Sequence, residues 1–126
     1  MNMLLAVFLG GGIGSILRHY SILMGKAWLG EGFPYGTLFV NVLGSFIIGI
    51  VMEAVAVKWS VPAHVQAFMV TGVLGGFTTF SSFSLDVYKL ANTGHPALAA
   101  GYVAVSIFVS LLAVFGGAYL VRGVMG

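Results

Sequence analysis

The chain has 126 residues, of which 60% are hydrophobic and 6% are charged. Soluble domains carry about 25% charged residues, so this composition excludes an ordinary water-soluble domain and indicates a membrane protein in contact with the lipid bilayer. Cysteine is absent, which excludes disulfides, thiolate metal sites and a cysteine nucleophile. The net charge of +2 comes from basic residues scattered singly along the chain, a pattern that does not predict nucleic-acid binding.

Four apolar runs are long enough to cross a membrane. A helix that spans a hydrocarbon core of about 30 Å needs about 20 largely apolar residues. We therefore predict an all-α membrane protein with one transmembrane domain over residues 1–126. The charge inside the first span is Arg18, which we expect near the end of the helix, snorkelling to the interface. The predicted spans are 3–24, 35–57, 63–90 and 97–121.

The second span carries a buried amide. Asn41 stands between two valines, and Thr37 lies one helical turn earlier on the same face. An unpaired amide in lipid is costly, so Asn41 is expected to bind a neighbouring helix or to face a polar cavity.

The third span is expected to be broken near residues 75–78, close to the bilayer midplane. Gly72, Gly75 and Gly76 interrupt its middle, and hydroxyl residues follow. Non-helical backbone at that depth must be buried or line a wet cavity, and its freed carbonyls need donors or a cation. The carbonyls of Gly75 and Thr78 are candidates to surround a small monovalent cation. The alternative is a glycine hinge whose carbonyls are satisfied by threonine and serine side chains.

Two aromatic residues follow this interruption. Phe80 and Phe83 are three residues apart, so they project from one face of a helix, with Ser81 and Ser84 on or near the same side. The positive edge of an aromatic ring can favour an anion weakly, and hydroxyls can donate hydrogen bonds to it. The alternative for both rings is helix packing.

The fourth span repeats the polar pattern. Ser106 and Ser110 are four residues apart, and Tyr102 lies one turn before them. These side chains could form hydrogen bonds between helices or line a path for an ion. No arrangement of nucleophile, base and orienting group can be assembled from the chain, so we do not predict an enzyme.

The loop charges predict insertion in both orientations. Lys58 and Arg122 would lie on one side of the membrane, and Lys26, Lys89 and the snorkelling Arg18 on the other, so the counts nearly balance. Because asymmetry of Lys and Arg in short loops sets orientation, a chain without asymmetry should insert both ways. A chain present in both orientations can pair with its inverted copy, which predicts an antiparallel homodimer.

Two segments carry a family resemblance. The stretches GTLFVNVLGS (36–45) and GVLGGFTTFSSFS (72–84) resemble signatures of the Fluc (CrcB-like) fluoride channels, and the likeness covers essentially the whole chain. One departure is Asp86, which stands where members of the family are expected to have glutamate.

The resemblance implies a passive fluoride-selective channel that exports cytoplasmic fluoride across the inner (plasma) membrane. It implies an antiparallel dimer with two pores and a central structural sodium ion, held by the carbonyls of Gly75 and Thr78 of each subunit. The implied pore residues are Phe80, Phe83, Asn41, Ser81, Ser110, Thr37, Ser82, Ser84, Tyr102 and Ser106.

Two other functions remain open at this point. A small proton-coupled multidrug-type exporter would need a carboxylate in the first span, whereas the first carboxylate of this chain is Glu31. A non-transporting assembly subunit would not have to place a glycine-rich break beside hydroxyls and aromatic rings.

Overall fold

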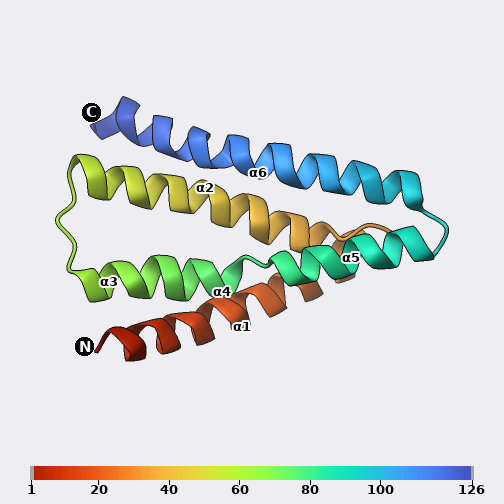
Figure 1. The fold of residues 1–126 in the computed structure, drawn as a ribbon, viewed down its shortest axis with the longest axis horizontal. Helices are drawn as coiled ribbons and strands as arrows, with labels where there is room; N and C mark the ends of the chain where they lie inside the picture. Colours follow the sequence, from red (N-terminus) through yellow and green to blue (C-terminus); the bar gives the residue numbers. More distant parts are fainter. Residues whose placement is uncertain (1, 126) are drawn as a thin grey trace.

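The computed structural model describes residues 2–125, whose regular secondary structure is entirely helical. The four long helical segments lie side by side along one axis, and the two ends of the chain lie at the same end of the molecule (Figure 1). The third segment is built from several shorter elements. In chain order the elements are α1 (Met3–Leu29), α2 (Tyr35–Val57), α3 (Ala63–Ala67), the π-helix η1 (Phe68–Leu74), α4 (Gly75–Phe77), α5 (Phe80–Asn92) and α6 (Pro96–Met125).

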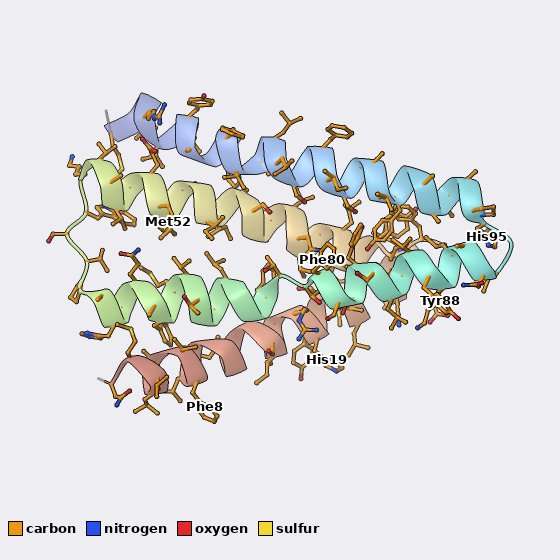
Figure 2. The ribbon with its side chains drawn as sticks, in the orientation of Figure 1. Phe8, His19, Met52, Phe80, Tyr88 and His95 are labelled. Carbon is orange, nitrogen blue, oxygen red and sulfur yellow. The ribbon has the colours of Figure 1, made fainter. Side chains whose placement is uncertain are left out.

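The four segments are long and apolar enough to cross a membrane, which confirms the predicted all-α fold with four spans. They cover Met3–Leu29, Tyr35–Val57, Ala63–Asn92 and Pro96–Met125. Large apolar side chains cover the outside of the bundle: Phe8 is 75% exposed and Phe108 is 67% exposed. Figure 2 shows Phe8 pointing away from the other helices. Such a surface suits lipid and not water.

The first helix is longer than its predicted span of 3–24. It continues to Leu29 and stops at Gly30, whose φ of 86° suits glycine and whose N–H donates to the Lys26 carbonyl. Lys26 lies in the last turn, where its charge complements the helix dipole. Apolar length therefore underestimated this helix, and Arg18 lies well inside it.

Glycines let the helix backbones touch. A Cβ built on Gly76 would lie 2.6 Å from the Gly11 carbonyl oxygen, so α1 and α4 pack backbone against backbone. Gly49 has the same role where α2 meets α6, because a Cβ there would collide with the Val114 carbonyl. Small residues permit this close approach between membrane helices.

The third segment is interrupted at two threonines. Helix α4 ends at Phe77, Thr78 (φ −84°, ψ 156°) and Thr79 (φ −154°, ψ 116°) are extended, and α5 begins at Phe80. Gly75, within the region where the glycines suggested a break, is helical with φ −63° and ψ −36°. The interruption lies about halfway along the molecule (Figure 1). The extended residues thus overlap the end of the predicted range 75–78 and continue to Thr79.

Candidate functional site

The side chain of Asn41 holds the extended backbone in place. Its Oδ1 accepts a hydrogen bond from the Thr79 N–H at 2.7 Å, and its Nδ2 donates to the Thr79 carbonyl at 3.1 Å. The amide thus replaces the peptide partners that a continuous helix would have supplied. The Thr79 hydroxyl also caps α5 by accepting from the Ser82 N–H at 3.1 Å. The buried amide predicted in the second span therefore binds the third segment.

Two carbonyls are released by these contacts. A helical carbonyl accepts from the N–H four residues later, but the N–H groups of Thr79 and Ser82 donate elsewhere. The carbonyls of Gly75 and Thr78 therefore lose their helical donors. Both residues line the same groove, and Gly75 is exposed in the single chain. Released carbonyl oxygens are the ligands that suit a small hard cation.

Within residues 2–125, no group of three His, Asp or Glu side chains could hold a metal ion. The released carbonyls of Gly75 and Thr78 fit a small cation, because they are neutral oxygen donors that lack a hydrogen-bond donor from their own helix.

Arg18 reaches inward and not to the interface, so the predicted snorkelling was wrong. Its Nε donates to the Gly76 carbonyl at 2.9 Å, and the side chain is half-buried. The reason is partly the length of α1, which continues for several turns past Arg18. The interruption also prevents a regular helical N–H from reaching the Gly76 carbonyl, and Arg18 supplies the missing donor.

A groove of about 370 Å³ lies beside the interruption, between α2, the third segment and α6. Phe80 lies at this interruption, close to α2 (Figure 2), and it is 78% exposed in the single chain. The groove unites residues that the sequence had singled out on three different spans: Asn41, Gly75, Thr78, Phe80, Phe83, Ser106 and Ser110.

Two serine hydroxyls in the groove have no partner. The Oγ atoms of Ser106 and Ser110 are buried and make no hydrogen bond within the described chain. They are four residues apart on α6, so they lie one turn apart on the same face. Leaving a buried hydroxyl unpaired costs about 1–3 kcal/mol. Both groups can therefore donate to a ligand that enters the groove.

A second cleft of about 430 Å³ contains Thr37 and Ser82. Tyr102 lies between the cleft and the groove: its ring is fully buried and its centroid is 5.2 Å from that of Phe83. The Tyr102 hydroxyl donates to Asp86 Oδ2 at 3.1 Å, and Asp86 lines the cleft. Three further predicted pore residues are thus placed at or beside this cleft.

The structure does not bring Ser81 and Ser84 into either hollow. Both are exposed; the Ser84 hydroxyl donates to the Phe80 carbonyl at 3.0 Å, and Ser81 Oγ lies 3.2 Å from Thr79 Oγ1. Ser81 follows Phe80 by one residue, and a rotation of about 100° turns it away from the face that the rings share. Ser84 lies one turn after Phe80, and its hydroxyl is bonded to the carbonyl of that turn.

Sequence reasoning missed two residues of this region. Thr79 anchors the interruption, and a threonine directly before a helix is a capping signal that would have identified it. Phe33 packs its ring against Tyr102 from the loop between α1 and α2, at a centroid distance of 5.3 Å. No periodic pattern points to a loop aromatic, so only the fold could reveal this contact.

Comparison with known proteins decides the family. The profile described as "CrcB-like protein, Camphor Resistance (CrcB)" matches residues 5–118. The chain belongs to the CrcB family. This confirms the membership expected from the two sequence signatures.

CrcB relatives match along nearly their whole length. A protein of Nitrobacter winogradskyi is 48% identical over 120 residues, which cover 94% of each chain. One from Granulibacter bethesdensis is 48% identical over 118 residues, covering 94% of this chain and 93% of its own. One from Chelativorans sp. is 46% identical over 125 residues, covering 99% and 100%. Each of these CrcB relatives is named "Fluoride-specific ion channel FluC".

Proposed function

We propose that this chain is a subunit of a fluoride-selective channel that lets cytoplasmic fluoride leave the cell passively. The observation that carries the proposal is the groove, where the rings of Phe80 and Phe83 lie beside the unpartnered hydroxyls of Ser106 and Ser110. The names of the relatives, which are 46–48% identical over nearly the whole chain, support the same function.

The groove chemistry suits a small anion that sheds its water. Ser106 and Ser110 each offer one O–H donor. Asn41 uses one N–H of its Nδ2 on the Thr79 carbonyl, which leaves the second for a ligand. The ring edges of Phe80 and Phe83 add weak attraction without a fixed charge. Conduction requires binding of this weak kind, because a tightly held ion would not leave.

Passive exit needs a driving force but no coupling group. Moving one charge across the membrane is worth about 2.3 kcal/mol per 100 mV, and a negative interior drives an anion outward. Helix α1 contains no Asp or Glu, so it lacks the carboxylate that the proton-coupled exporter would require. These features favour the channel over the exporter.

Fluoride efflux from liposomes tests the proposal. Vesicles loaded with potassium fluoride and potassium chloride, and containing the purified protein, should release fluoride when valinomycin is added and should retain chloride. The release is followed with ion-selective electrodes, and protein-free vesicles are the control. Equal loss of both anions, or no fluoride release, would contradict the proposal.

We further propose that two copies pair antiparallel to form two pores. Phe80 is 78% exposed although it carries a large apolar ring, and the groove that it lines opens to the outside of the single chain. A second copy would cover both. The carbonyls of Gly75 and Thr78 from each copy would then hold a central sodium ion, which would balance their dipoles and stabilise the dimer.

Cation-dependent stability tests the sodium site. The melting temperature of the dimer in detergent should be higher in sodium chloride than in choline chloride at the same ionic strength, because sodium would bind the folded dimer and not the unfolded chain. Chemical cross-linking gives the oligomeric state. Equal melting temperatures in the two salts would contradict the proposed sodium site. A monomer under all conditions would contradict the proposed dimer.

The positions of the basic residues support insertion in both orientations. Lys58 and Arg122 lie just after the last turn of α2 and in the last turn of α6, at one end of the bundle. Lys26 and Lys89 lie in the last turns of α1 and α5, at the other end of the bundle (Figure 1). Because the chain has no cysteine, Gly32→Cys and Val124→Cys each introduce a single label. An impermeant thiol reagent should modify part of each population in intact cells. Complete labelling of one variant and none of the other would contradict dual orientation.

A further inference from the structure

The loop between α1 and α2 places an aromatic ring where the groove and the cleft approach each other. The Phe33 ring is half-buried, and its centroid lies 5.3 Å from that of Tyr102 with an interplanar angle of 83°. Tyr102 in turn contacts Phe83 at 5.2 Å, and Phe83 contacts Phe80 at 5.6 Å. A continuous row of four rings therefore leads from the groove to the cleft, and Phe33 is its outer member.

We propose that the Phe33 ring controls the rate of anion passage: supported by the buried ring of Tyr102, it forms an outer aromatic constriction between the cleft and the groove. This inference rests on the proposed function. In this proposal a small monovalent anion occupies the cleft before it enters the groove. Between the two hollows it passes the ring of Phe33.

Tyr102 cannot supply a polar donor at this boundary. A tyrosine hydroxyl has one O–H, and that of Tyr102 donates to Asp86 Oδ2 at 3.1 Å. The ring is also fully buried. Tyr102 therefore offers no free hydroxyl to an anion at the constriction. In the near-perpendicular pair, Phe33 is the ring that also lines the cleft.

The cleft has cations that can concentrate anions. Lys26 and Lys89 line it together with Glu31 and Asp86, so its formal charges balance. Among residues 2–125, the ion pair with a nitrogen–oxygen distance of 4.0 Å or less is the one between Arg122 and Glu53. Neither Lys26 nor Lys89 is therefore paired with a carboxylate. The two ammonium groups remain available to an incoming anion. Thr37 and Ser82, which carry hydroxyl groups, line the same cleft.

Local structure holds the Phe33 ring in position. The Phe33 carbonyl accepts from the Tyr35 N–H at 2.9 Å, and Pro34 between them restricts the backbone. The Phe33 and Tyr35 rings also pack at 5.0 Å. The ring is thus supported from its own loop and from Tyr102 on α6, so it is preorganised although it lies outside a helix.

Substitution of Phe33 tests the constriction. Phe33→Leu should lower the initial rate of fluoride efflux from liposomes about tenfold, the fold-change expected from losing one aromatic edge interaction. Phe33→Tyr keeps the ring and should stay within about threefold of the original rate. Phe8→Leu is the matched control, because Phe8 is 75% exposed on the outer face of α1 and should not affect the rate. Melting temperature and elution as a dimer report assembly separately.

The outcomes separate this inference from the proposed function. Absence of fluoride release by the original protein would refute the proposed function itself. Release by the original protein with an equal rate for Phe33→Leu would refute only the constriction. If Phe33→Leu failed to assemble, Phe33→Met, which nearly keeps the side-chain volume, would replace it with the same expected loss. Failure of both to assemble would show that the ring is needed for folding, and would overturn its role in anion passage.

Discussion

Phe83→Ile is expected to abolish fluoride efflux while the protein still folds and assembles. Phe83 is 9% exposed and lies between Phe80 and Tyr102, with ring centroids 5.6 Å and 5.2 Å away. Isoleucine keeps much of the apolar volume but removes the ring edge and both ring contacts. A fall of about a hundredfold in the efflux rate corresponds to about 2.7 kcal/mol of added barrier. The measurement is the initial rate of fluoride release from liposomes.

Two comparisons make this result specific. Phe108→Ile changes a phenylalanine that is 67% exposed on α6, and it should leave the rate unchanged. Phe80→Ile should also abolish efflux, and it should hardly affect folding of the single subunit because Phe80 is 78% exposed there. If Phe83→Ile transported fluoride normally, its ring would be a packing residue and the proposed path would have to be redrawn.

Asn41→Leu is expected to destabilise the protein and to stop transport. The two side chains have nearly the same shape, but leucine leaves the Thr79 N–H and the Thr79 carbonyl without their side-chain partner. Each unpaired buried polar group costs about 1–3 kcal/mol, so the combined loss is about 2–6 kcal/mol. The extended geometry of Thr78 and Thr79 should then be lost, and with it the shape of the groove. Thermal unfolding in detergent and liposome efflux measure the two effects.

A graded series tests whether the backbone contacts are responsible. Thr79→Ala keeps the backbone bonds to Asn41 and removes only the hydroxyl that caps α5, so it should cost about 1 kcal/mol. Asn92→Leu removes an exposed amide that donates to the Tyr88 carbonyl, and should have little effect. Equal melting temperatures for Asn41→Leu and Asn92→Leu would contradict the role given to Asn41.

The interruption illustrates how sequence and structure share the explanation. Adjacent glycines suggested a break near 75–78, yet Gly75 is helical and the extended residues are Thr78 and Thr79. Glycine permits many conformations and does not choose one. Here, Gly76 serves the close approach of α1, and the hydrogen bonds of Asn41 select the extended residues. That choice depends on a side chain 38 residues away, which no local pattern contains.

Arg18 shows the same limit for a charged residue. Its position in the chain suggested a snorkelling side chain, whereas it donates to the Gly76 carbonyl 58 residues later. A charge within an apolar helix has several ways to satisfy its donors, and the nearest unpaired acceptor decides between them. The location of that acceptor follows from the interruption, which in turn follows from the packing of α2 against the third segment.

The sequence alone determined the membrane fold, the four spans and the CrcB family. These follow from apolar length, because every backbone group in lipid must find a partner within its own helix, and from two contiguous signatures. Only the tertiary structure decided which polar groups meet. It gathered Asn41, Phe83, Ser106 and Ser110 into one groove, left Ser81 and Ser84 outside, and placed Phe33 against Tyr102. Insertion of a helix into lipid depends on the local composition of the sequence. The partner of a polar group depends on long-range packing in three dimensions.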